Sequence, residues 1–174
     1  MKKQALITGA TSGIGRATAL RLAAEGYDIT ATGRRAERLE TLRREIEAAG
    51  GRCTALVFDV RSEAEVRKFL SPLERVDLLI NNAGLAAGLE HIDQGDTADW
   101  DAMIDTNVKG LLYVTRVVTP KMVAAGGGHV FNIGSPACWE GISTISLTVI
   151  WAGNCAAHAI ASAMSSPVSG VTPS

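Results

Sequence analysis

The sequence is short of cysteine, and its acidic and basic residues nearly cancel. The three cysteines are an odd number without a C-x-x-C spacing, which argues against a disulfide framework and against a zinc site. A net charge of −1 gives no electrostatic reason to expect nucleic acid or an anionic membrane as a partner. The apolar run after Lys2 and Lys3 is too short for a signal peptide. We therefore expect a cytoplasmic protein in a reducing compartment, without a bound metal.

Charged side chains are missing from the end of the chain. Residues 141–174 contain no Asp, Glu, Lys, Arg or Tyr. A membrane span over 142–163 is conceivable, but Asn154, His158 and several hydroxyl groups make this stretch a poor lipid helix. The chain is long enough for one domain with a real core. We therefore expect one domain over residues 1–140 and an apolar tail, rich in Ser, Ala and Thr, that forms no separate domain.

Within residues 1–140, short apolar runs alternate with segments of helical periodicity. This alternation is typical of an α/β fold, here a Rossmann-like doubly wound parallel sheet of five strands with helices on both faces. Asp96 or Thr97 is expected to cap a long helix that ends near Pro120. The strands are predicted over residues 5–7, 27–32, 54–58, 77–80 and 129–133.

A glycine-rich turn follows the first predicted strand, and no Gly-Lys-Ser/Thr comes after it, so the nucleoside-triphosphate P-loop does not fit. Glycines let backbone N–H groups approach a ligand, and the start of the next helix directs unpaired donors and partial positive charge at it. A dinucleotide pyrophosphate is the better interpretation; the alternative is a turn that only packs a helix on a strand. The candidate cofactor-binding residues here are Gly9, Thr11, Ser12, Gly13, Ile14 and Gly15.

The acidic residue that commonly meets the adenosine ribose of a dinucleotide is absent after the second strand. Arg34 and Arg35 stand there instead. An acid would accept from the ribose 2′-hydroxyl, whereas the guanidinium fork suits a phosphate. The sequence therefore favours NADP over NAD. Alternatively, the two arginines only open the next helix, although cations are mildly unfavourable at that end without a bound anion.

Further candidates follow the later strands, because ligands gather at the carboxyl ends of the strands in an open parallel sheet. Ser135 lacks the Gly-x-Ser-x-Gly pattern of a nucleophile elbow, which argues against esterase chemistry. Asn107, on the long helix, is either a structural hydrogen-bonding hub or part of a polar site. The other candidates at these strand ends are Asp59, Val60, Asn82, Ala83 and Gly84.

Together these residues resemble the short-chain dehydrogenases/reductases, and the resemblance spans Lys3 to about Glu140. The matching motifs are Thr8-Gly9-x3-Gly13-Ile14-Gly15, Asp59, Asn81-Asn82-Ala83-Gly84, Asn107 in Asn-Val-Lys-Gly and Ser135 in Asn-Ile-Gly-Ser. A narrower similarity, to the NADP-dependent 3-hydroxy acid dehydrogenases that also oxidise serine and allo-threonine, is carried by Ala31-Thr32-Gly33-Arg34-Arg35, Gly84-Leu85-Ala86 and the segment Asp99-Trp100 to Asp105-Thr106-Asn107.

The resemblance implies a homo-oligomeric oxidoreductase that moves a hydride between the nicotinamide of NADP and a small 3-hydroxy acid or alcohol. In this family a serine orients the substrate oxygen, and an asparagine supports a proton-relay water. Ser135 and Asn107 match these two positions and are the candidate catalytic residues.

The family's catalytic tyrosine and lysine have no counterparts here. They would fall at Thr148 and Ala152, or in an alternative alignment at Ala156 and Ile160. The chain also ends before the family's usual length. These departures predict impaired hydride transfer. The alternatives are a non-catalytic dinucleotide-binding remnant and a frame-shifted fragment.

Overall fold

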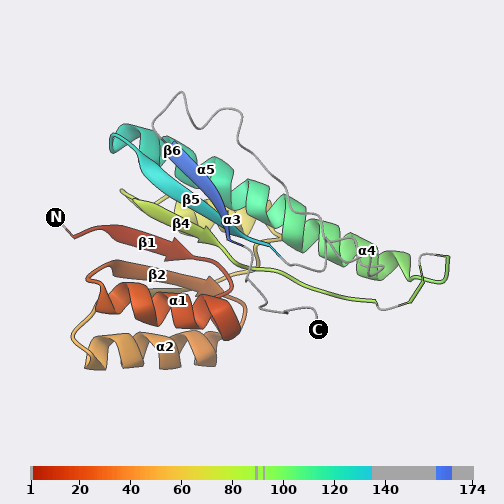
Figure 1. Ribbon diagram of the computed structural model, residues 1–174, viewed down its shortest axis with the longest axis horizontal. Coiled ribbons are helices and arrows are strands. Elements are labelled where there is room, and N and C mark those ends of the chain that lie inside the picture. Colours follow the sequence, from red (N-terminus) through yellow and green to blue (C-terminus); the bar gives the residue numbers. More distant parts are fainter. Residues whose placement is uncertain (1, 89, 92, 135–159, 166–174) are drawn as a thin grey trace, which may run out of the picture.

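The computed structural model describes residues 2–88, 90–91 and 93–134, and the backbone of 160–165. Helices and strands alternate through most of this range (Figure 1). Their bounds are β1 (Gln4–Ile7), α1 (Gly13–Ala24), β2 (Asp28–Gly33), α2 (Ala36–Ala48), β3 (Cys53–Val57), α3 (Glu63–Leu70), β4 (Leu78–Asn81), α4 (Thr97–Met103), η1 (Ile104–Gly110), α5 (Leu111–Ala124), β5 (Gly128–Ile133) and β6 (Ile160–Ser165).

The strands form one parallel sheet in the order β3-β2-β1-β4-β5-β6. The chain winds outward from β1 in one direction through β2 and β3, then returns to the other side of β1 with β4. Leu6 of β1 therefore lies opposite Thr30 of β2 on one side and Leu79 of β4 on the other. The order of the strands reverses between β1 and β4, which is where open α/β sheets bind ligands. The predicted Rossmann-like doubly wound sheet is confirmed.

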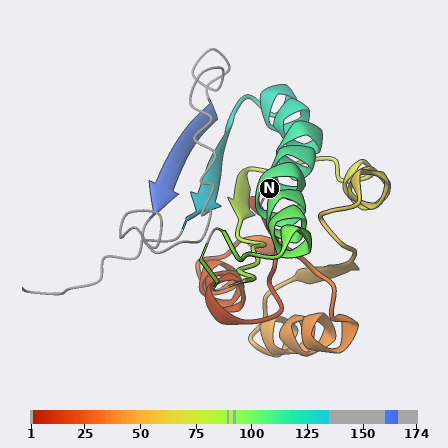
Figure 2. The same cartoon turned by 90° about the vertical axis from the view of Figure 1, so that its right-hand side faces the viewer.

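Helices cover both faces of the sheet, and each face has its own core (Figure 2). Successive side chains of a strand point to opposite faces. Leu6 is buried with Leu79 and Val114 on the face covered by α3 and α5. Its neighbour Ile7 is buried with Leu39 on the face covered by α1 and α2. Strands buried on both sides explain why the sequence shows short continuous apolar runs rather than alternation.

One feature of the C-terminal half differs from the sequence prediction. The sheet has a sixth strand, β6, which pairs with β5 along its whole length, so β5 is not an edge strand. Four of the six residues of 160–165 are Ala or Ser, which leaves little periodicity from which to predict a strand. Pro120 lies inside the last turn and a half of α5, which ends at Ala124, so the prediction that the long helix ends near this proline is confirmed. The remaining tail, 141–159 and 166–174, lies outside the described residues.

The long helical segment is not regular throughout. Asp96 caps it, with its carboxylate accepting from the Ala98 N–H at 2.8 Å. Between α4 and α5, the seven residues of η1 form a π-helical stretch, a conformation that is rare and often found at functional sites. None of the helices that the structure describes is both long and apolar enough to span a membrane.

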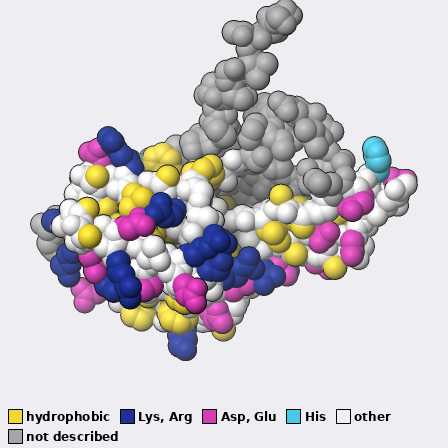
Figure 3. All heavy atoms as spheres, turned by 90° about the horizontal axis from the view of Figure 1, so that it is seen from below, with side chains coloured by type: hydrophobic (Ala, Val, Ile, Leu, Met, Phe, Trp, Pro, Cys, Tyr) yellow, Lys and Arg dark blue, Asp and Glu magenta, His cyan; other side chains and the backbone are white. Residues whose placement is uncertain are grey.

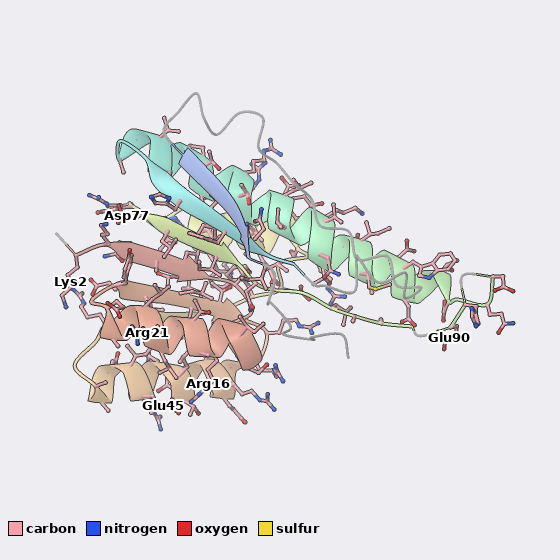
Figure 4. All side chains as sticks on the ribbon, viewed as in Figure 1. Lys2, Arg16, Arg21, Glu45, Asp77 and Glu90 are labelled. Carbon is pink, nitrogen blue, oxygen red and sulfur yellow. The ribbon has the colours of Figure 1, made fainter. Side chains whose placement is uncertain are left out.

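The charged residues of α1 and α2 are intermixed and largely paired (Figure 3). Arg43 bonds both Glu40 and Glu47 on α2, and this pairing with Arg43 and Arg44 lowers the pKa of Glu40 to about 2. Arg16 of α1 reaches Glu45 of α2, where Figure 4 shows the two side chains side by side. Each such exposed ion pair contributes little to the free energy of unfolding. This surface is a solvated face, as the interleaved charges predict.

Replacing Leu79 by Ala tests the two-sided burial of the sheet. Leu79 is fully buried in β4, so Leu79→Ala is expected to lower the free energy of unfolding by about 2–5 kcal/mol through lost burial and the cavity left behind. Urea unfolding followed by circular dichroism measures this change. Leu112→Ala on α5 is the matched control, because Leu112 is 41% exposed and its truncation should cost less than about 1 kcal/mol. Equal losses in the two variants would contradict the packing.

Candidate functional site

A cleft of about 220 Å³ opens at the carboxyl ends of the strands, beside the point where the strand order reverses. Each of the first four strands contributes the residues that follow it, and η1 closes one side. The cleft is lined by Gly9, Thr11, Ser12, Gly33, Arg34, Arg35, Phe58, Asp59, Val60, Asn82, Ala83, Gly84 and Thr106.

Most of the cofactor-binding candidates from the sequence lie in this lining. Gly13, Ile14 and Gly15 do not, and Ser135 lies outside the described residues. The residues that sequence reasoning missed are Gly33, Phe58 and Thr106. Gly33 and Thr106 stand inside motifs that carry the family resemblance but were not chosen as site residues, and Phe58 immediately precedes the candidate Asp59.

The glycine turn fits tightly against the end of β4. Gly9 has φ 66°, and a Cβ on it would stand 2.8 Å from Ala83 Cα. A Cβ on Gly15 would stand 2.3 Å from Nδ2 of Asn82. Gly13, with φ 56°, faces open space instead. The tight packing of the turn therefore rests on Gly9 and Gly15, and Gly13 takes no part in it.

Asn82 and Thr8 hold this joint together. Asn82 Nδ2 donates to the carbonyl oxygens of Thr8 and Gly9 at 2.9 and 3.1 Å. Thr8 Oγ1 in turn accepts from the backbone N–H groups of Asn82 and Ala83, both at 3.0 Å. The Asn82 amide, predicted as a cofactor contact, thus braces the turn from the cleft side.

The N-terminus of α1 is left without a side-chain cap. Ser12 occupies the N-cap position but its side chain does not cap the helix. Ser12 Oγ and Thr11 Oγ1 accept instead from Nη2 of Arg35, at 3.0 and 2.8 Å. The N–H groups of the first turn therefore remain unpaired donors, and together with the partial positive charge of the helix end they suit an anion in the cleft. Arg35 bridges the end of β2 to the turn.

Asp59 lies between two arginines. Its Oδ2 accepts from Nε and Nη2 of Arg61 at 2.9 and 2.7 Å, and its Oδ1 accepts from the Arg61 backbone N–H at 3.0 Å. Arg34 Nη1 stands 3.9 Å from Oδ2. Burial raises the pKa of the Asp59 carboxyl, but the Arg61 hydrogen bonds and the charges of Arg61 and Arg34 outweigh it and hold that pKa below its ordinary value. No sequence motif singled out Arg61.

Asn107 lies on η1 and uses its amide on a single neighbour. Its Oδ1 accepts from the Leu85 N–H, and its Nδ2 donates to the Leu85 carbonyl oxygen, both at 2.8 Å. This is the geometry of the structural hub, one of the two roles left open by the sequence. Asn107 thereby fixes the loop that follows Gly84 at the rim of the cleft.

Comparison with known proteins agrees with this geometry. A family model described as short chain dehydrogenase matches residues 3–164. The NADP-dependent 3-hydroxy acid dehydrogenase YdfG of Salmonella typhi is 45% identical over 136 residues, which cover 76% of this chain and 54% of that protein. The chain thus spans about half the length of the curated relatives it matches.

Two solved structures show the same fold. The closed form of serine dehydrogenase complexed with NADP+ superposes with a TM-score of 0.74 at 41% identity, covering 80% of this chain and 57% of that one. A metagenomic short-chain oxidoreductase in complex with NADP has a TM-score of 0.82 at 28% identity, covering 96% and 82% of the two chains.

Gly15→Ala tests the fit of the glycine turn. The added methyl would overlap the Asn82 amide and the Gly9 carbonyl oxygen, so we expect a loss of about 1–3 kcal/mol in the free energy of unfolding despite the better helix propensity of Ala. Urea denaturation provides the measurement. Gly84→Ala serves as the control, because its Cβ would meet neighbours only at ordinary contact distance. A Gly15→Ala variant as stable as the parent chain would refute the tight joint.

The Arg61–Asp59 pair predicts a pH dependence. Because the folded-state pKa of Asp59 is lowered, the stabilisation linked to it is complete above the unfolded pKa, about 3.9, and is lost as the pH falls through the folded value. Carbon-detected NMR should show the Asp59 carboxyl titrating below its ordinary range, with the midpoint moving upward in Arg61→Gln. Arg67→Gln, which removes an arginine paired with Glu63, should leave the midpoint in place. An unchanged midpoint in Arg61→Gln would contradict the pairing.

Proposed function

The chain belongs to the short-chain dehydrogenase family, and from that membership we propose that it binds NADP in the cleft at the carboxyl ends of its strands. We propose further that it acts as an oxidoreductase, transferring a hydride between NADP and a small 3-hydroxy acid or alcohol. The observation that carries the proposal is the meeting, in one cleft, of an uncapped helix N-terminus with the guanidinium groups of Arg34 and Arg35. A dinucleotide with an extra ribose phosphate has anionic groups for both.

The residues present fit the cofactor. The first turn of α1 would hold the pyrophosphate, where Gly13 leaves open space for a close approach. Arg34, whose side chain is 63% exposed, would meet the 2′-phosphate, and Asp59 with Val60 would border the adenine. When bound, NADP supplies the nicotinamide carbon that gives or accepts the hydride.

The substrate class is taken from relatives whose names specify a 3-hydroxy acid and serine. In this chain Ser135 would orient the substrate oxygen, and Asn107 would position the rim loop at Leu85 beside it. We propose as well that the protein is a homo-oligomer and that it is located in the cytoplasm.

A second candidate function is NADP binding without hydride transfer. A tyrosine is a poor base at neutral pH unless a cation lowers its pKa from about 10. The sequence contains two tyrosines, Tyr27 and Tyr113. Tyr27 packs against one core and Tyr113 against the other, and neither lines the cleft. No lysine follows Lys121 in the sequence.

Thermal melting with NADP and with NAD tests the binding. At a concentration of 100 times Kd, NADP should raise the melting temperature by about 5–10 °C, and NAD should raise it less. Arg34→Gln should remove most of the difference between the two cofactors, whereas Arg67→Gln on α3, outside the cleft, should preserve it. No shift with either cofactor would overturn both candidate functions.

Turnover then separates the two functions. NADP reduction followed at 340 nm with serine or 3-hydroxypropionate supports the oxidoreductase. A melting shift without any reduction supports the binding module and rejects the hydride-transfer half of the proposal.

A further inference from the structure

Arg61 lies just outside the cleft lining and is paired with Asp59, a residue within it. Asp59 projects a carboxylate into the cleft, and that carboxylate faces two guanidinium groups at unequal distances. Arg61 contacts both carboxylate oxygens at 2.7–3.0 Å. Arg34 remains 3.9 Å from Oδ2, beyond hydrogen-bonding distance, with its side chain 63% exposed.

The pairing of Asp59 with Arg61 is local in sequence. This explains why Arg61, and not Arg34, forms the hydrogen bonds with the Asp59 carboxylate. Arg61 is two residues from Asp59, and its own backbone N–H closes the turn onto Oδ1. A side chain that caps a backbone N–H two residues on is the Asx-turn arrangement, which forms without bringing distant segments together. Arg34 reaches the same carboxylate from the end of a different strand, β2. The charge of Asp105 on η1 also favours the charged Arg61 beside it.

The Asp59 side chain is only 24% exposed, so it has lost much of its water. A partly buried carboxylate without a partner is costly, and the nearest other cation is Arg34. If Arg61 were absent, Asp59 would draw Arg34 into an ion pair. Any anion in the cleft would then have to compete with Asp59 for that guanidinium.

We infer that Arg61 is a positioning residue that keeps Arg34 available for a phosphate monoester in the cleft. Arg61 occupies the Asp59 carboxylate, and Arg34 is thereby left with its donors free for the 2′-phosphate of an adenosine nucleotide. This inference rests on the proposed function. It assigns to Arg61 an influence on cofactor choice without direct contact with the cofactor.

Calorimetric titration with adenosine 2′,5′-bisphosphate and with 5′-AMP tests the inference on the full chain. The two nucleotides differ only in the 2′-phosphate. Arg61→Gln should weaken binding of the bisphosphate about fivefold, the effect of losing an exposed charge pair, while 5′-AMP binding changes less than about twofold. Arg67→Gln makes the same change in net charge outside the cleft and should leave both affinities unchanged.

A double-mutant cycle with Asp59→Asn separates positioning from a general contribution of positive charge. If Arg61 acts through Asp59, Arg61→Gln should have no further effect on bisphosphate binding once the carboxylate is gone. In the chain that retains Asp59, Arg61→Lys keeps the positive charge and one hydrogen bond. It should therefore bind the bisphosphate more tightly than Arg61→Gln does. Circular dichroism and melting of each variant confirm that it is folded.

The outcomes are distinct. Equal losses from Arg61→Gln with and without Asp59 would show a direct effect of charge and overturn the inference, as would an unchanged affinity in Arg61→Gln. If the parent chain binds neither nucleotide, the proposed function fails, and the inference fails with it.

Discussion

The joint between the glycine turn and the end of β4 determines where the other parts of the cleft lie. Here Gly9 and Gly15 come so close to Asn82 and Ala83 that neither glycine has room for a side chain. The Asn82 amide and the Thr8 hydroxyl close the joint with four hydrogen bonds. Because the joint spans the point where the strand order reverses, it fixes the start of α1 against the two strands that flank the cleft.

Three arginines around this joint do different things, although their side chains are chemically identical. Arg35 is bonded to the hydroxyl groups of the turn and ties β2 to α1. Arg61 is bonded to Asp59. Arg34 stands farther from Asp59, with Nη1 3.9 Å from Oδ2, and its side chain is 63% exposed. The positive charge at the cleft is thus divided between arginines bonded to the cleft's own side chains and an arginine with an exposed side chain.

The sequence predicts the sheet and most of the cleft because both follow from simple patterns. Apolar runs of strand length identify the strands, and parallel topology then brings the residues after each strand to one edge. Arg61 escapes this reasoning because its effect depends on a side-chain conformation two residues from Asp59, which no periodicity encodes. The π-helical stretch at η1 has no signal in the apolar periodicity. Within it, Gly110 packs so close to Val60 that a Cβ would come within 2.8 Å of a Val60 methyl. The tail strand β6 lacks a pattern altogether.

Burial of β1 on both faces has a consequence for how the strands find their alignment. In a strand with one wet face, a shift by one residue would expose apolar side chains, and this penalty fixes the register. Leu6 and Ile7 are both buried, so the exposure of apolar side chains does less to fix the register of β1 against β4. Polar contacts at the two ends of β1 help to fix its register. The Gln4 N–H donates to Asp77 Oδ2 at 2.8 Å, and Thr8 Oγ1 accepts from the N–H groups of Asn82 and Ala83. The residues at the mouth of the cleft therefore also help to set the register of β1 against β4. A substitution there affects the pairing of these strands as well as the binding of a ligand.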